Sequence, residues 1–215
     1  MIRLALLLLL LATPAPAQPV CVCLKCLTQL YDSYWAPAGS MKPTILPGQC
    51  FTARTVFDPV DLTPGTIVIF RHPATDAPFF KRIVATAGQT VQMREGRLHI
   101  DGTPVPTSEA GTFTEPNTPS DHSGALPRCA NAPAPGGDCT KTRLTETLGH
   151  QSYDILDAGP GPLDNTPPVT VPEGHIFVLG DNRDNSVDSR LTDISGGLGP
   201  VPIENVTGLL DEVRP

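Results

Sequence analysis

The sequence predicts a mainly β protein, with an antiparallel β-sheet core and an inserted β lobe rich in loops. Pro (25) and Gly (19) together make up about a fifth of the 215 residues, which is high for a helical protein but below the level typical of disorder. The apolar residues occur in short runs between Gly- and Pro-containing turns, as expected for short strands. A hydrophobic content of 40% is enough for a core, and the length fits one domain with a sizeable insertion.

Strands are expected where an apolar or alternating run lies between turn residues. We predict them over residues 51–56, 66–70, 80–86, 91–94, 97–100 and 176–179. The fourth and fifth of these form a predicted hairpin, because Glu95-Gly96 between them favours a tight turn. Residues 204–213 are expected to pack back on the core sheet.

Between residues 103 and 170 the composition changes to Pro, Thr, Gly and Asn with little periodicity. This segment is the predicted inserted lobe, and residues 144–156 are expected to contain its strands. The lobe separates a first part of the core (36–102) from a second part (171–215).

The N-terminal residues 1–17 are typical of a secretory signal peptide. Arg3 precedes an apolar stretch at 4–12, and Ala15-Pro16-Ala17 provides a cleavage site of the A-x-A type. About 11 apolar residues span only about 16 Å as a helix, less than the roughly 30 Å of a bilayer core. A short uncleaved anchor remains the alternative. Either reading places the rest of the chain outside the cytoplasm, at the outer face of the membrane or in the periplasm.

Six cysteines agree with export, because disulfides form in oxidising compartments. Cys129 and Cys139 flank a Gly/Pro-rich loop and are expected to pair. The other cysteines are three in the N-terminal segment 18–35 (Cys21, Cys23 and Cys26) and Cys50. A bridge from this group to Cys50 is favoured over a zinc or redox site, because C-x-C-x-x-C without a second cluster fits tetrahedral zinc poorly.

The net charge of the chain limits the kinds of partner that it is expected to bind. The net charge of −7 and the lack of a basic run argue against a nucleic-acid partner.

Three motifs carry the chemistry. The first is Gly-Ser-Met-Lys-Pro-Thr at residues 39–44, a turn that could hold the Ser40 hydroxyl out beside a substrate. The second is Phe-Lys-Arg-Ile-Val at residues 80–84. In a strand, Lys81 would stand among apolar neighbours, and such burial lowers a lysine pKa until the amine can act as a base. The alternative is a strand lysine without a catalytic role, whose ammonium group extends into solvent.

The third motif is Gly-Asp-Asn-Arg-Asp-Asn-Ser-Val-Asp-Ser-Arg at residues 180–190, directly after an apolar run. Its acidic and basic side chains can neutralise each other if they pack inside. A calcium loop is rejected, because Ser189 stands where the required Gly would be and Ser195 where the terminal Glu would be. No metal and no organic cofactor is implied.

Together, and in this order, the three motifs resemble those of bacterial signal peptidase I, a Ser/Lys endopeptidase family with an antiparallel β-sheet catalytic core. The matched segments run from about residue 36 to 91 and from 171 to near the C-terminus. The resemblance implies that Ser40 is the nucleophile, that Lys81 is the general base and that Ser186 orients the lysine amine. It also implies two ion pairs that shape the floor of the site, which are Asp181 with Arg82 and Asp188 with Arg190.

The resemblance further implies substrates that are exported preproteins, with small residues at the first and third positions before the cut, and work at a membrane surface. Two features depart from the family. Ala38 stands where family members often carry a hydroxyl that helps to bind the oxyanion, which leaves the Ser40 backbone N–H as the one nameable donor. The expected transmembrane anchor is also missing at normal length.

Three other functions compete with this interpretation. A self-cleaving repressor with the same dyad would need a DNA-binding region, which the exported N-terminus does not supply. A catalytically inactive peptide-binding module is opposed by the intact Ser40, Lys81 and Ser186. A maturase dedicated to one exported protein stays open.

Overall fold

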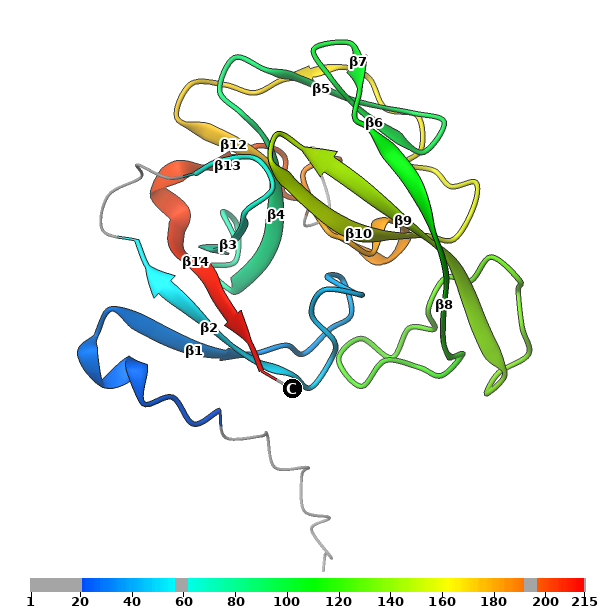
Figure 1. Cartoon of the computed structure of the whole chain (residues 1–215), viewed down its shortest axis with the longest axis horizontal. Coiled ribbons are helices and arrows are strands. Elements are labelled where there is room, and N and C mark those ends of the chain that lie inside the picture. Colours follow the sequence, from blue (N-terminus) through cyan, green and yellow to red (C-terminus); the bar gives the residue numbers. More distant parts are fainter. Residues whose placement is uncertain (1–20, 57–61, 192–196, 215) are drawn as a thin grey trace, which may run out of the picture.

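A computed structural model describes residues 21–56, 62–191 and 197–214. The described residues form three sheets, of seven, four and three strands, and every pairing between their strands is antiparallel (Figure 1). The predicted fold class is therefore confirmed. The predicted signal peptide or anchor at residues 1–17 lies outside the described residues.

The seven-stranded sheet has the order β1-β2-β14-β3-β4-β12-β13. Its strands are β1 (Tyr31–Trp35), β2 (Cys50–Thr55), β3 (Ile67–Arg71), β4 (Pro78–Thr86), β12 (His175–Leu179), β13 (Val201–Pro202) and β14 (Val206–Val213). The sequence predicts β2, β3, β4 and β12 to within two residues at each end, and the C-terminal segment pairs with β2 and β3 as expected. Apolar runs mark these strands because several of them are buried on both faces, as in β3, where four of five residues are buried.

The four-stranded sheet has the order β11-β5-β6-β7 and contains the predicted hairpin. Its strands are β5 (Thr90–Arg94), β6 (Arg97–Ile100), β7 (Thr103–Pro104) and β11 (Val169–Thr170). Glu95 and Gly96, between β5 and β6, both have positive φ, at 48° and 74°. The tight turn at this point therefore has the conformation that a Gly favours.

The three-stranded sheet β10-β9-β8 is built from the segment between residues 103 and 170. It comprises β8 (Thr107–Pro116), β9 (Asp138–Leu148) and β10 (Gln151–Asp157). The sequence predicts strands only within 144–156 and so misses β8 and the first half of β9. The reason lies in β9, where the buried positions include Lys141 and Glu146. These charged side chains interrupt the alternating apolar pattern that would identify a strand.

Three short 3-10 helices complete the described secondary structure. They are η1 (Lys25–Thr28), η2 (Arg183–Asn185) and η3 (Ile203–Asn205). None of the helices in the described part of the chain has the length and hydrophobicity that crossing a bilayer requires.

The apolar core forms three clusters. One joins the sheets and includes Val84, Leu98, Ile155 and Phe177. A second lies within the large sheet around Phe70 and Val178. The third lies beneath the turn between β1 and β2 and consists of buried Ala36, Met41, Ile45, Phe51, Ala53, Ile67 and Ile69. This third cluster is the support of the first sequence motif.

All six cysteines are paired. The structure contains the Cys129–Cys139 disulfide that the sequence predicts. It also contains a bridge from the N-terminal group to Cys50, formed by Cys21. Cys23 and Cys26 pair with each other, so the segment ahead of β1 is held to itself and to β2.

Candidate active site

Ser40 lies in the turn that connects β1 to β2. The neighbouring Met41 and Ile45 are fully buried in the core cluster beneath the turn. The turn is closed by a hydrogen bond from the Ile45 N–H to the Met41 carbonyl, at 2.9 Å. The Lys42 side chain folds back over Gly39, where a Cβ would lie 2.8 Å from Lys42 Cε. The absence of a Cβ at Gly39 therefore leaves room for the Lys42 side chain.

Lys81 reaches this turn from β4. Its side chain is only 4% exposed, and its Nζ lies 2.8 Å from Ser40 Oγ and 3.1 Å from the Phe80 carbonyl oxygen. The rings of Phe79 and Phe80 lie 5.4 and 5.7 Å from the Nζ. The two groups that the sequence pairs are thus in hydrogen-bonding contact, and the amine is shielded from water.

The environment of Lys81 makes its amine easier to deprotonate. Burial lowers the pKa of Lys81 from 10.5 to about 8, and the negative charges of Asp188 and Asp181 oppose this change. The two carboxylates favour the ammonium form and therefore keep the pKa higher than burial alone would set it.

Both ion pairs expected at the floor of the site are present. Asp181 receives hydrogen bonds from Arg82 Nε at 2.8 Å and Arg82 Nη2 at 2.6 Å. Asp188 receives them from Arg190 Nε at 2.8 Å and Nη2 at 2.9 Å. All four residues are buried. Each carboxylate is therefore neutralised by a bidentate guanidinium, the geometry that makes a buried charge tolerable.

Ser186 differs from its expected role in one respect. Its Oγ is buried and makes no hydrogen bond to Lys81 in this structure, while its interaction with Asp188 is among the causes that lower the pKa of that carboxyl. The hydroxyl is nevertheless close to the dyad, since a Cβ at Gly180 would lie 2.2 Å from Ser186 Oγ and 2.6 Å from the Ser40 carbonyl oxygen.

A count of donors shows what this hydroxyl can do. A neutral lysine amine has two N–H groups and one lone pair. In the neutral form, Ser40 O–H donates to the lone pair and the Phe80 carbonyl accepts one N–H. The second N–H is then available to Ser186 Oγ.

The oxyanion position has one backbone donor that can be named. The Ser40 N–H makes no hydrogen bond to any part of the chain that the structure describes, and Ala38 and Ser40 line the same pocket. Ala38 has no hydroxyl to serve as the second donor.

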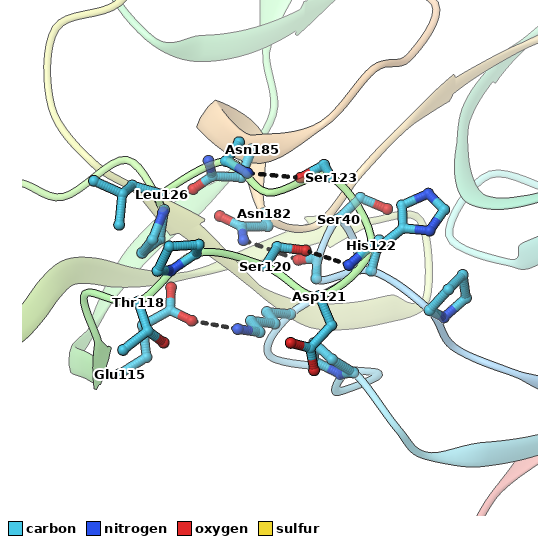
Figure 2. Close-up of a pocket in the computed structure, with 18 of the residues that line it drawn as sticks. Ser40, Glu115, Thr118, Ser120, Asp121, His122, Ser123, Leu126, Asn182 and Asn185 are labelled. Atoms are coloured by element: carbon cyan, nitrogen blue, oxygen red, sulfur yellow. Dashed lines mark hydrogen bonds and ion pairs between the residues drawn. The ribbon is translucent and has the colours of Figure 1, made fainter. Parts of the chain in front are cut away.

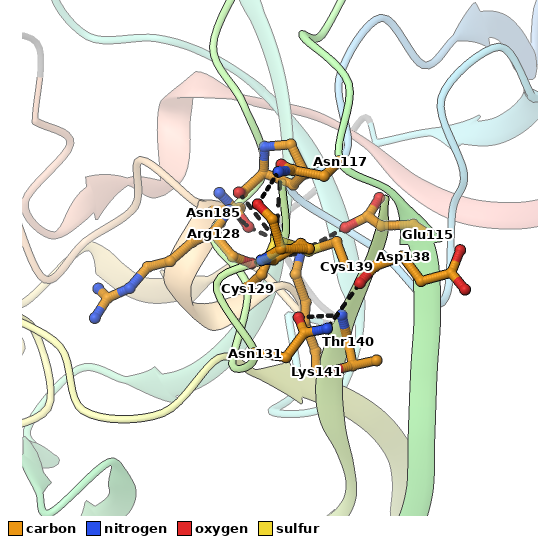
Figure 3. The surroundings of a disulfide bond; sticks show 12 residues. Glu115, Asn117, Arg128, Cys129, Asn131, Asp138, Cys139, Thr140, Lys141 and Asn185 are labelled. Atoms are coloured by element: carbon orange, nitrogen blue, oxygen red, sulfur yellow. Dashed lines mark hydrogen bonds and ion pairs between the residues drawn. A yellow bond between two sulfur atoms is a disulfide. The ribbon is translucent and has the colours of Figure 1, made fainter. Parts of the chain in front are cut away.

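The pocket beside Ser40 has a volume of about 1020 Å³. One wall is the turn around Ser40, and another is the segment between residues 118 and 127, which includes Ser120, His122 and Leu126 (Figure 2). The Cys129–Cys139 disulfide closes the loop that follows this segment, where Asn131 also bonds Asp138 and Thr140 across the loop (Figure 3). The inserted lobe therefore supplies part of the surface around the serine.

Four residues that hold this turn in place, one of them Lys42 within it, are not among the site residues predicted from the sequence. Asn182 Nδ2 donates to the Gly39 carbonyl at 2.9 Å, and the Asn182 N–H donates to the Ser40 carbonyl at 3.0 Å. Lys42 forms an ion pair with Glu115, which also binds Lys141. Asn182 lies inside a motif that the sequence singles out, but Glu115 and Lys141 lie in the lobe, where no pattern marks them.

The chain is similar in sequence to known signal peptidases. A profile of the family described as "Signal peptidase, peptidase S26" matches residues 10–213. The chain is 29% identical over 180 residues to a signal peptidase I of Bacillus licheniformis, covering 83% of this chain and 74% of that protein. It is 29% identical over 199 residues to a signal peptidase I of Pseudomonas aeruginosa, covering 83% of this chain and 63% of that protein.

A signal peptidase I of known crystal structure, from Enterococcus faecalis, is 25% identical, with 69% of this chain and 96% of that chain covered and a TM-score of 0.37. The family profile, by contrast, extends over almost the whole sequence and includes all three motifs. The chain therefore belongs to the signal peptidase family, peptidase S26.

Proposed function

We propose that this serine peptidase removes signal peptides from exported preproteins by means of a Ser40–Lys81 dyad. One observation carries the assignment of the dyad: the Lys81 amine is buried, lies 2.8 Å from Ser40 Oγ, and has its pKa lowered to about 8. At pH 7 about a tenth of such an amine is neutral and able to act as a base. An ordinary lysine would be neutral in less than about a thousandth of the molecules.

The reaction begins when neutral Lys81 takes the proton of the Ser40 hydroxyl and the oxygen attacks the carbonyl carbon of the substrate. The negative charge that develops on the carbonyl oxygen is stabilised by the Ser40 N–H. The ammonium of Lys81 then gives its proton to the leaving amine, which leaves an ester on Ser40. Water, deprotonated by Lys81, hydrolyses the ester and regenerates the enzyme.

Ser186 and the ion pairs act on Lys81 in this scheme. The Ser186 hydroxyl accepts the second N–H of the amine and so directs the lone pair towards Ser40. Asp181 and Asp188, held by Arg82 and Arg190, stabilise the ammonium that forms after proton transfer. Their charges oppose the effect of burial, and the balance keeps the lysine able both to take and to return a proton.

The substrate is an extended chain with small residues at the first and third positions before the cut. β1 is an edge strand of the seven-stranded sheet and leads into the Ser40 turn. An extended peptide can pair with such an edge by backbone hydrogen bonds. An enzyme that cleaves exported preproteins needs its active site outside the cytoplasm, at the outer face of the cytoplasmic membrane or in the periplasm. The three disulfides fit such an oxidising compartment.

Incubation of the purified chain with a preprotein that carries an A-x-A cleavage site tests the proposal. The wild type is expected to release the signal peptide, and Ser40→Ala and Lys81→Met are expected to be inactive. Ser152→Ala, at an exposed serine of β10, serves as the matched control and should retain full activity. Cleavage that survives in Lys81→Met would refute the assignment of the base.

A further inference from the structure

Lys141 of the inserted lobe is a fully buried ammonium whose three donors are all used. Its Nζ donates to Glu115 Oε1 at 2.7 Å, to Asn185 Oδ1 at 2.8 Å and to Asn182 Oδ1 at 3.2 Å. Its side-chain exposure is 0%. Burial of a charge is costly unless its hydrogen-bond partners are present. The three acceptors therefore stabilise Lys141, and their hydrogen bonds connect the lobe to the motif at 180–190.

The Asn182 amide continues the contact to the nucleophile turn. While its Oδ1 accepts from Lys141, its Nδ2 donates to the Gly39 carbonyl at 2.9 Å. That carbonyl belongs to the same peptide unit as the Ser40 N–H. The C=O and N–H of a trans peptide point in opposite directions. A donor that holds the carbonyl therefore aims the N–H away from Asn182.

This arrangement is a chain of amide hydrogen bonds with a cation at one end. Each bond in such a chain polarises the next, because an amide that accepts at its oxygen becomes a stronger donor at its nitrogen. The order is Lys141, the Asn182 side chain, the Gly39–Ser40 peptide, and then the oxyanion of the substrate. This polarisation matters most when the Ser40 N–H is not supported by a second oxyanion donor. Ala38 has no hydroxyl that could serve as one.

The negative charge of Glu115 does not fully neutralise the Lys141 ammonium beside Asn182. The carboxylate is shared, since it also pairs with Lys42. Burial works to raise the pKa of the Glu115 carboxyl, but hydrogen bonds from Lys141 and Lys42 outweigh it and hold the pKa below its usual value. Burial lowers the pKa of Lys141, and its hydrogen bond to Glu115 and the charge of that carboxylate oppose this change. With both lysines protonated, two ammonium groups on one carboxylate leave a net positive charge beside the turn.

We propose that Lys141 is a positioning residue that aims and strengthens the Ser40 N–H as an oxyanion donor through Asn182, in place of the hydroxyl missing at Ala38. The inference rests on the proposed peptidase function. It gives the inserted lobe a part in the reaction, although the Lys141 amine binds Glu115, Asn182 and Asn185 and not Ser40 or Lys81 themselves.

The test compares Lys141→Met with wild type in two backgrounds, one with Ala38 and one with Ala38→Ser. With Ala38, Lys141→Met is expected to lower kcat about tenfold or more and to leave KM within about threefold, because the oxyanion forms only in the transition state. In the Ala38→Ser background, the new hydroxyl shares the charge, and the same change should cost less than about threefold in kcat.

Arg143→Met is the matched control. It removes a partly exposed cation of the same strand, β9, whose side chain binds the Ala110 carbonyl and Asp154, so its kcat should stay within about threefold of wild type. Asn182→Asp carries the test if Lys141→Met does not fold. It keeps an acceptor for Lys141, cannot donate to Gly39, and should show the same dependence on Ala38→Ser.

Equal losses of kcat in both backgrounds would show a merely structural role and overturn the inference. The same holds if Arg143→Met lowers kcat as much as Lys141→Met or Asn182→Asp does. Lack of peptidase activity in the wild type would instead overturn the proposed function, and the inference with it.

Discussion

The pH dependence of cleavage follows from the pKa of Lys81. With the pKa at about 8, the amine is neutral in about 1% of molecules at pH 6 and in about 90% at pH 9. Only the neutral amine can take the serine proton. We therefore expect kcat/KM to rise about 90-fold from pH 6 to pH 9, to increase about tenfold per pH unit below pH 7, and to level off above pH 8.5.

The assay is the initial rate of cleavage of a fluorogenic peptide with an A-x-A site, at substrate concentrations well below KM, in buffers of constant ionic strength. Circular dichroism at each pH verifies that the protein stays folded. A limb centred near pH 6.5 would indicate a histidine base, and an acid limb absent between pH 6 and 9 would show that no lysine deprotonates. Either result would refute the reasoning.

The same pKa, an ion pair and a disulfide lead to three stability predictions. The folded-state pKa of Lys81 lies below the 10.5 of a free lysine, so the unfolded chain binds more protons between pH 8 and 10.5 and stability rises with pH in that window. Below pH 8, keeping Lys81 protonated in the folded state costs about 3 kcal/mol of stability. Lys81→Met should therefore be inactive, yet more stable than wild type by roughly that amount at pH 7 in urea unfolding. The charge-related part of this difference should be gone by pH 10.5. Asp181→Ala leaves Arg82 buried without its carboxylate and should lower the free energy of unfolding by about 3–5 kcal/mol, measured in the same way. Replacement of Cys129 and Cys139 by Ser opens an 11-residue loop and should cost about 3 kcal/mol in the chain-entropy account, measured by thermal unfolding.

Matched controls come from exposed groups. Glu212→Ala breaks the exposed pair with Lys25 and should change stability by less than about 0.5 kcal/mol. Lys25→Met removes an exposed lysine and should not reproduce the pH-dependent gain of Lys81→Met. An Asp181→Ala variant as stable as Glu212→Ala would contradict the view that the Arg82 pair is buried and neutralised.

The sequence by itself predicts much of the site because its information is local. The turn around Ser40, the strand that carries Lys81 and the acidic loop at 180–190 are each short segments whose residue types and order are distinctive. Apolar runs between Gly and Pro turns likewise predict the strands of the large sheet, since burial on both faces requires them. The even cysteine count and the Gly/Pro loop between Cys129 and Cys139 lead to the pairing that the structure contains.

Only the tertiary structure decides what depends on distance between remote residues. The pKa of Lys81 is a balance between burial and the charges of Asp181 and Asp188, which lie about a hundred positions away in the chain. The sequence also cannot predict the hydrogen bonds from Lys141 through Asn182 to the Ser40 turn. Lys141 interrupts the apolar pattern of its strand, and the reason for its burial becomes clear only from the acceptors that the fold brings to it. Periodicity records which face of a strand is apolar, whereas electrostatics depends on which charges the fold brings within a few ångströms.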